Sequence, residues 1–360
     1  MRPDIATIES IVAESIEPTT GMPLGQLETA ISVAVDDAGK VDIDLCLGFA
    51  CEGIHEVLAE GIWQSLSRVD GVEDVNLEIT TDIPHGPKTA DLPNLANVKH
   101  VIAVASGKGG VGKSTTTVNL ALALAAEGAL VGILDADIYG PSQPHLLGVG
   151  DQRPQTEGQS FIPVEAFGIK TMSMGYLVTE KTPMVWRGPM AAGALQQMLG
   201  QTQWGELEYL LVDMPPGTGD IQLTLAQKVP LSGSVIVTTP QDLALLDARK
   251  GIEMFEKVNV PVLGIVENMS THICSSCGHE EHIFGAGGGE RVAQDYHTQV
   301  LGSLPLAMAV REGSDAGKPL LIDDPNSEIS ERYRQMARKL GAQLWQSSKV
   351  TAPTIEISDD

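Results

Sequence analysis

The sequence has few cysteines, and it contains no long apolar run. Four cysteines in 360 residues are too few for a disulfide framework, so we expect reduced thiols and a cytoplasmic location. No apolar stretch approaches the roughly 20 residues that a membrane-spanning helix needs. The N-terminal residues lack the charged and apolar regions of a signal peptide, which also favours the cytoplasm.

Basic residues are also scarce. The chain has 23 basic and 47 acidic residues, a formal net charge of −24. Residues 1–99 contain 18 acidic and 5 basic side chains, so −13 of that charge lies in the first part of the chain. This excess disfavours nucleic acid and anionic membranes as partners. It suits basic surfaces on partner proteins, and it also favours solubility.

The most informative segment is GKGGVGKS at residues 107–114, which meets the phosphate-binding pattern G-x-x-x-x-G-K-[ST]. Residues 101–106 predict a buried parallel strand entering this loop, and residues 114–127 predict a helix that ends at Gly128. The glycines let backbone N–H groups surround phosphate oxygens, and the helix N-terminus adds its dipole. We expect Lys113 to supply a cation and Ser114 a hydroxyl for Mg²⁺. The residues expected to bind the nucleotide are Gly107, Lys108, Gly109, Gly110, Val111, Gly112, Lys113, Ser114 and Thr115.

Lys108 is a second lysine inside this loop. Because Lys113 already serves the phosphates, Lys108 is free to point outward, toward a nucleotide held by a second copy of the chain. The alternative is a solvated loop lysine. The run GKGGVGKST resembles the deviant Walker A loop of MinD/ParA/ArsA/NifH-type ATPases, and this resemblance implies that Lys108 acts across a dimer.

Carboxylates follow two further apolar segments. Residues 130–134 predict a strand that leads into Asp135 and Asp137, and residues 209–212 predict one that leads into Asp213. Carboxyl ends of neighbouring parallel strands face the crevice where ligands bind, so we expect Asp213 to hold Mg²⁺ through water and Asp137 to orient the attacking water. Asp135 either supports the metal shell or caps a helix. The turn-rich residues 215–219 predict a switch that senses the γ-phosphate.

Cys274 and Cys277 form a C-x-x-C pair in a loop of small and polar residues, which suits thiolates converging on a metal. A redox dithiol is one interpretation, but no helix clearly starts here. A zinc site with His279 and His282 is another, although its ligand spacing is cramped. A third is a [4Fe–4S] cluster, which needs four cysteines and therefore two copies of the chain. The dimer expected from Lys108 favours this third interpretation.

Several segments together resemble the Mrp/ApbC family of iron–sulfur cluster carriers, over roughly residues 99–345. They are the phosphate loop, VWRGPM at 185–190, DMPPGTGD at 213–220, ENMS at 267–270 and the C-x-x-C pair. The resemblance implies a cytosolic ATPase in which Cys274 and Cys277 bridge a cluster between protomers. The deviant Walker A class also implies that Asn268 reads adenine, although Asn268 could equally form a turn. Arg187 recurs in the family, and we assign it no physical role beyond a loop cation.

The front of the chain predicts a different unit. Its expected order is helix 5–15, strands 27–35 and 41–47, helix 52–67 and strand 72–79, which fits one small sheet with two helices. This order resembles the MIP18-like domain fused to many Mrp/ApbC proteins, and Cys51 matches a cysteine at that domain's second helix, where a helix dipole would lower its pKa. A half-buried structural cysteine is the alternative for Cys51, and we expect Cys46 to be a core residue.

The sequence thus predicts an α/β protein: a doubly wound, mostly parallel sheet of P-loop NTPase type, preceded by a small α+β domain. The expected limits are 1–82 for the small domain, 83–98 for a linker, 99–346 for the ATPase domain and 347–360 for an acidic tail. Within the ATPase domain we expect a helix at 290–296, a strand at 300–305, a loop at 306–317 and an amphipathic helix at 327–346 that packs on the domain rather than on a membrane.

The main functional hypothesis is a homodimeric ATPase that binds a [4Fe–4S] cluster and passes it between scaffold proteins and apo iron–sulfur proteins. Its expected cofactors are ATP, Mg²⁺ and the cluster, and its expected catalytic residues are Lys108, Lys113, Asp137 and Asp213. One alternative is a MinD/ParA-like positioning ATPase, which would need a grip on membrane or DNA and would leave the cysteine pair without a purpose. Another is a zinc-stabilised ATPase.

Overall fold

The computed structural model describes residues 3–87, 92–177, 188–274 and 276–350. It divides into two compact units, one of which is residues 85–340. The other combines the chain up to Pro84 with the chain from Gly341 onward. Arg187 and the end of the predicted acidic tail lie outside the described residues. No helix in the described ranges is long and apolar enough to cross a membrane.

The small unit contains a three-stranded sheet in the order β1-β2-β3 and two helices. β1 (Ala30–Val35) pairs antiparallel with β2 (Lys40–Leu47) across a tight turn, in which the Asp36 carboxylate accepts the N–H groups of Ala38 and Lys40. β2 then pairs parallel with β3 (Asp74–Thr81), so a crossover is needed between them. η1 (Glu52–Ile54) and α2 (His55–Leu66) form this crossover, and α1 (Ile5–Glu14) precedes the sheet.

Part of the small unit's core comes from the other end of the sequence. The last helix, α11 (Glu328–Val350), contributes Ala342 and Trp345 to the apolar cluster of the small unit. The rings of Trp345 and Phe49 lie 5.9 Å apart between centroids. A side chain at Gly48 would place its Cβ only 2.3 Å from the Trp345 ring, so glycine is required there. The helix predicted for residues 327–346 therefore runs four residues further, and its last part completes the small unit.

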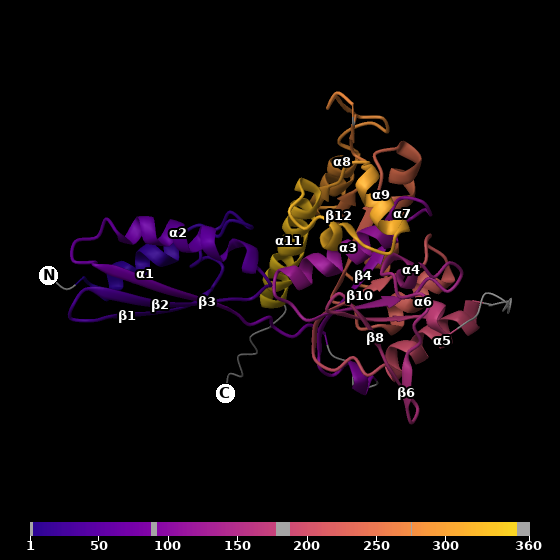
Figure 1. Cartoon of the computed structure of the whole chain (residues 1–360), viewed down its shortest axis with the longest axis horizontal. Helices are drawn as coiled ribbons and strands as arrows, with labels where there is room; N and C mark the ends of the chain where they lie inside the picture. Colours follow the sequence, from indigo (N-terminus) through magenta and orange to yellow (C-terminus); the bar gives the residue numbers. More distant parts are fainter. Residues whose placement is uncertain (1–2, 88–91, 178–187, 275, 351–360) are drawn as a thin grey trace, which may run out of the picture. The chain divides into compact units, whose positions relative to one another are not determined.

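The larger unit is built on an eight-stranded sheet in the order β15-β12-β11-β4-β10-β5-β9-β8 (Figure 1). All neighbouring strands are parallel except β8 and β9. The strands are β4 (Val98–Ala105), β5 (Val131–Asp135), β8 (Val164–Ala166), β9 (Ile169–Ser173), β10 (Leu207–Asp213), β11 (Gly233–Thr238), β12 (Val262–Glu267) and β15 (Val300–Ser303).

Helices connect these strands or, for the last three in the chain, follow β15. They are α3 (Lys113–Ala126), α4 (Gln143–Leu146), α5 (Gly188–Gln201), α6 (Asp220–Lys228), α7 (Asp242–Lys257), α8 (Gly288–Asp295), α9 (Met308–Asp315), α10 (Leu320–Asp323) and the first part of α11. Two short hairpins project from this framework: β6 (Gln155–Glu157) with β7 (Ser160–Ile162), and β13 (His272–Ile273) with β14 (Glu280–Glu281). Single 3₁₀ turns form η2 (Pro93–Leu95) and η3 (Met174–Tyr176).

The strand order places the switch point of the sheet at β4. After β4 the chain adds β5 on one side, returns to insert β10 between them, and then adds β11 on the other side of β4. Ligands in doubly wound sheets bind at the carboxyl ends of the strands where the order reverses. The predicted doubly wound, mostly parallel sheet with a small α+β unit before it is confirmed.

One predicted loop is wrong. Residues 306–317 contain the helix α9 (Met308–Asp315), where we expected a loop. Gly313 lies inside the helix, where a Cβ would come within 2.6 Å of the carbonyl oxygen of Lys318. Gly317, at a φ of +67°, follows the helix. Gly313 is therefore needed for close packing, and only Gly317 marks the end of the helix.

Candidate functional site

The phosphate loop lies between β4 and α3, at the switch point. Gly110 and Gly112 adopt φ angles of +86° and +85°, which favour glycine. At Gly107 a Cβ would come within 2.1 Å of the backbone oxygen of Asp247, and at Gly112 within 2.2 Å of the amide nitrogen of Asn268. Three of the pattern's glycines are therefore required by conformation or by close packing. The loop presents its N–H groups ahead of the first turn of α3, which is a ready site for phosphate.

Lys113 and Asp213 form a buried ion pair in this site. Lys113 is 6% exposed and Asp213 is fully buried, and the ammonium donates to Oδ1 of the carboxylate. The same ammonium lies 3.2 Å from the hydroxyl oxygen of Ser114. It therefore stands between the two oxygen ligands predicted for Mg²⁺, which shows that this position accepts a cation. The donor set of one hydroxyl and one carboxylate fits Mg²⁺.

Two further side chains hold the Asp213 carboxylate. The hydroxyl of Thr117 donates to Oδ1 at 3.2 Å, and the side-chain amide of Gln143 donates to Oδ2 at 2.8 Å. Neither residue was predicted, because each acts through the tertiary fold and neither belongs to a local motif. The only sequence signal for Gln143 was its place directly before Pro144, at the start of a helix.

Asp135 is fully buried at the end of β5, in register with Asp213 on β10. Its Oδ2 accepts hydrogen bonds from the backbone of Ser142 at 3.0 Å, from the backbone of Gln143 at 3.1 Å and from the hydroxyl of Ser173 at 3.0 Å. Burial, and next the charge of Asp213, raise the pKa of Asp135 to about 7. Asp135 therefore anchors the start of α4. This contact is closer to the predicted role in capping a helix than to the predicted role in supporting the metal ligands.

Asp137 lies half-buried beyond the end of β5, where its Oδ1 accepts the N–H of Gly140 at 3.2 Å. Burial raises the pKa of this carboxyl, while the charge of Lys113 acts in the opposite direction. A carboxylate with a raised pKa near the phosphate-binding lysine is suited to contact a water molecule there. Its role in orienting the attacking water stays a prediction.

Asn268 contacts the phosphate loop directly. Its amide nitrogen donates to the backbone oxygen of Val111 at 2.9 Å, and its own oxygen accepts the N–H of Met269 at 3.0 Å. Met269 has a φ of +57°, an uncommon conformation for a side chain of this size. The amide of Asn268 keeps one more donor hydrogen beyond the bond to Val111. Adenine recognition by Asn268 stays a prediction.

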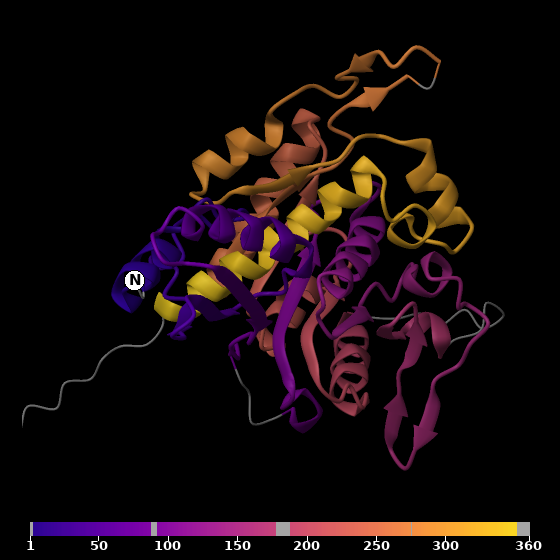
Figure 2. The ribbon, with the colours of Figure 1, turned by 60° about the vertical axis from the view of Figure 1, so that its left-hand side comes forward.

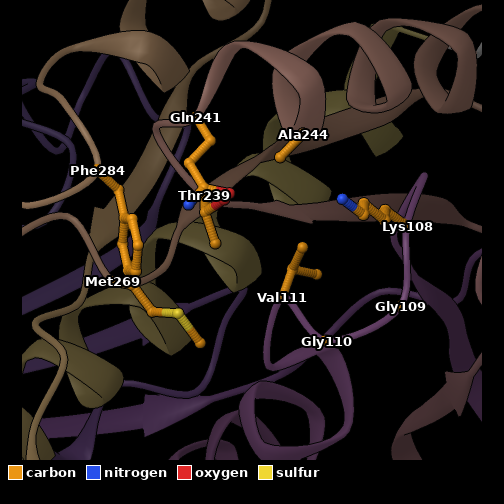
Figure 3. Close-up of a pocket in the computed structure, with 9 residues that line it drawn as sticks. All are labelled: Lys108, Gly109, Gly110, Val111, Thr239, Gln241, Ala244, Met269 and Phe284. Carbon is orange, nitrogen blue, oxygen red and sulfur yellow. The ribbon is translucent and has the colours of Figure 1, made fainter.

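Lys108 lies over a cavity of about 200 Å³ beside the loop (Figure 3). Figure 3 shows its ammonium reaching over this cavity from the loop, with Met269 and Phe284 at the opposite wall. Lys108 is exposed, and among the described residues its ammonium has no hydrogen-bond or ion-pair partner. The side chain is thus available to another molecule. The remaining lining residues are Gly109, Gly110, Val111, Thr239, Gln241 and Ala244.

Cys274 and Cys277 lie at the tip of the β13–β14 hairpin, which extends away from the rest of the larger unit (Figure 2). The turn is closed by the N–H of Cys274 bonding to the oxygen of His279 at 2.9 Å, and by the N–H of Gly278 bonding to the oxygen of Cys274 at 2.8 Å. Cys277 is exposed and Cys274 is half-exposed. Hydrogen bonds from the backbone of Ser276 and Cys277 lower the pKa of the Cys274 thiol, which favours a metal-binding thiolate.

The two histidines considered as zinc ligands have other partners. Nδ1 of His282 lies 3.0 Å from the backbone oxygen of Ser270, and Nε2 of His279 lies 3.5 Å from the Glu281 carboxylate. Among the described residues, no three His, Cys, Asp or Glu side chains are grouped so that they could hold a metal. Within the described part of the chain, the hairpin therefore presents its two thiols without a third protein ligand grouped beside them.

The cysteines of the small unit are placed differently. Cys51 is fully buried directly before η1, with its sulfur 3.7 Å from Nε2 of His55. Burial lowers the pKa of His55, while the nearby charge of Glu52 acts against this shift. Cys46 is half-buried on β2 rather than in the core where we expected it. Neither Cys46 nor Cys51 lies at an exposed turn, whereas Cys274 and Cys277 do.

A phosphate loop at the switch point, a buried ion pair behind it and carboxylates at the ends of β5 and β10 define a P-loop NTPase with a MinD/ParA-like fold. The structure of a nucleotide-binding protein in complex with ADP from Archaeoglobus fulgidus aligns with a TM-score of 0.58 at 39% identity. The alignment covers 66% of this chain and 93% of the Archaeoglobus fulgidus chain. A cell division ATPase MinD from Pyrococcus furiosus aligns at 0.51 and 21% identity, which supports the fold alone.

Residues 97–341 match the family described as NUBPL iron-transfer P-loop NTPase, and the chain belongs to this family. An iron-sulfur cluster carrier protein from Pseudomonas fragi is 62% identical over 283 residues, which are 78% of this chain and 99% of that protein. One from Salmonella typhimurium is 51% identical over 347 residues, 96% of this chain and 94% of that protein. The iron-sulfur cluster transfer protein NUBPL of mouse is 51% identical over 252 residues, 69% of this chain and 79% of that protein.

Proposed function

We propose that this protein is an ATP-hydrolysing iron–sulfur cluster carrier that works as a homodimer. The observation that carries the proposal is the pair of accessible thiols on the β13–β14 hairpin, beside a nucleotide site in the same unit. A [4Fe–4S] cluster needs four thiolates, and one hairpin offers two. Two copies related by a twofold axis would complete the set. The names of the relatives support an iron–sulfur cargo.

Hydrolysis would proceed at the phosphate loop. Backbone N–H groups and Lys113 hold the phosphates, and Asp137 orients the water that attacks the γ-phosphoryl group to yield ADP and phosphate. Ser114 and Asp213 would hold Mg²⁺, which would supply positive charge against the phosphates. Lys108, exposed beside the cavity, would contribute its charge to the nucleotide of the second copy.

Few residues separate the nucleotide site from the cysteine pair along the sequence. Asn268 bonds to the phosphate loop and Met269 lines the adjacent cavity, and Cys274 follows five residues after Met269. On the other side of the hairpin, Phe284 lines the same cavity, two residues after His282. Both ends of the hairpin therefore begin at the nucleotide site, so a change in that site can alter how two hairpins hold a cluster.

The expected partners are a second copy of the chain, scaffold proteins that supply clusters and apo-proteins that receive them. Thiolates of this kind fit a reducing compartment such as the cytoplasm. Neither nucleic acid nor a membrane is an expected partner, because the chain is strongly acidic.

Reconstitution with iron and sulfide under anaerobic conditions tests the proposal. The parent protein should hold four iron and four sulfide atoms per dimer, with broad visible absorption. Cys274→Ser with Cys277→Ser should abolish iron binding and leave ATP binding intact. Cys46→Ser, which changes a half-buried thiol on β2, is the matched control and should load fully.

Three results would contradict the proposal. One is full iron loading of the double variant. Another is stoichiometric zinc in a colourless protein as purified. The third is a monomer in sedimentation experiments even with both nucleotide and cluster present.

A further inference from the structure

The side chain of Gln143 is fully buried in the nucleotide site, although no sequence motif marks it. Its amide nitrogen donates to Oδ2 of Asp213 at 2.8 Å and to the backbone oxygen of Ser114 at 3.1 Å. Both neighbours are acceptors only, so the atom between them must be the nitrogen, and the orientation of the amide is unambiguous. Gln143 thus ties the predicted Mg²⁺ carboxylate to the end of the phosphate loop.

The carbonyl oxygen of the same side chain is buried and has no hydrogen-bond partner among the described residues. Leaving a buried acceptor without a partner is unfavourable, so such atoms are rare and are often completed by a water molecule or a ligand. The nitrogen of this amide is already bonded to groups of the metal site. The free acceptor therefore lies within the same small region as Ser114 and Asp213.

The backbone of Gln143 is also held in place. Its backbone N–H donates to the buried carboxylate of Asp135, which also binds Ser142 and Ser173. Pro144 follows it in α4 and limits the backbone further. A side chain anchored in this way is suited to hold a neighbour in place rather than to move with the nucleotide.

Asp213 will need that support when nucleotide binds. In this structure Lys113 and Thr117 contact one carboxylate oxygen and Gln143 contacts the other. When Lys113 turns to the phosphates, a fully buried carboxylate loses its ammonium and is held by Thr117 and Gln143 alone. A divalent cation can then replace the lost positive charge.

We propose that Gln143 is a positioning residue of the metal–nucleotide site: its amide nitrogen holds Asp213, and its carbonyl oxygen accepts a hydrogen bond from a water molecule bound to the metal. This inference rests on the proposed binding of nucleotide with Mg²⁺. Groups that orient metal ligands typically change metal affinity by about 10–100-fold when removed. Gln143 should therefore determine metal affinity more than nucleotide affinity.

The test compares Gln143→Met with Gln143→Glu by Mn²⁺ electron paramagnetic resonance in the presence of ADP. Met keeps the length of the side chain and removes every polar contact, so Mn²⁺ should bind about 10–100-fold more weakly. Glu keeps the acceptor for the water molecule and adds a negative charge, but it loses the donor to Asp213, so Mn²⁺ should bind more tightly than in the Met variant without reaching the parent affinity. ADP affinity in EDTA should stay near the parent value in both variants.

Gln222→Met is the matched control, because Gln222 is also a buried glutamine but donates to the backbone oxygen of Pro216 at 2.7 Å. It should leave Mn²⁺ binding unchanged. Parent-like Mn²⁺ affinity in both Gln143 variants would overturn the inference, and so would an equal loss of metal and metal-free ADP binding. A parent protein that binds no Mn²⁺ with ADP would instead contradict the nucleotide part of the proposed function.

Discussion

Replacing Lys113 by Met should destabilise the larger unit even when no nucleotide is present. Lys113 is 6% exposed and its partner Asp213 is fully buried, so the substitution leaves a buried carboxylate without its counter-charge. Breaking a buried ion pair by removing one partner costs about 3–5 kcal/mol. In a unit of this size, each kcal/mol shifts Tm by about 2–4 °C, so the expected decrease is about 6–20 °C.

The double variant Lys113→Met with Asp213→Asn separates charge from packing. An Asn at 213 can still accept from the side-chain amide of Gln143 and donate to the hydroxyl oxygen of Thr117, because both groups lie within hydrogen-bond distance of the native carboxylate. Because the unpaired charge at position 213 is then removed, the double variant should recover most of the lost stability while remaining unable to hydrolyse ATP.

Thermal unfolding followed by circular dichroism, in EDTA and without nucleotide, is the assay for both variants. A destabilising effect of the unpaired Asp213 charge is refuted if Lys113→Met melts at the parent temperature. It is equally refuted if the double variant is no more stable than Lys113→Met, because the buried charge would then not be the cause.

Two further predictions concern Asp135 and the small unit. The pKa of Asp135 is raised to about 7, so between its unfolded pKa near 4 and pH 7 the folded state binds more protons, and stability falls as pH rises through this range. Asp135→Asn should flatten that slope of Tm against pH, and an unchanged slope would count against the raised pKa. Trp345→Ala should destabilise the small unit by about 3–5 kcal/mol, because it removes a core side chain packed on Phe49 and Gly48. Hydrogen exchange of the β2 amides measures this loss, and full protection in the variant would exclude a core role for Trp345.

The parts of the site that were predictable from sequence are those set by local pattern. The phosphate loop follows from glycine spacing between an apolar strand and a helix, and the carboxylates at the ends of β5 and β10 follow from parallel-strand topology. Gln143 and Thr117 could not be predicted in the same way. Each reaches Asp213 across about 70 to 100 positions of sequence, so only the folded sheet brings them together.

The fold shows the same division. β4, β5 and β10 have strong apolar runs, and the structure places them where the sequence suggested, with small shifts at their ends. Glycine was less informative, because it marks both helix ends and close contacts. Gly313 is of the second kind, and it lies inside α9 without ending the helix. The sharing of α11 between two cores depends on the contact of Trp345 with Gly48, which no local pattern reveals.

The placement of Trp345 also affects how the chain matures during translation. Residues up to Pro84 leave the ribosome well before Ala342 and Trp345, which belong to the same apolar cluster. Proteins generally acquire structure from the N-terminus as synthesis proceeds. The apolar core of the small unit therefore stays incomplete while some 250 intervening residues are synthesised. The small unit can therefore complete its apolar cluster only after Ala342 and Trp345 have been synthesised.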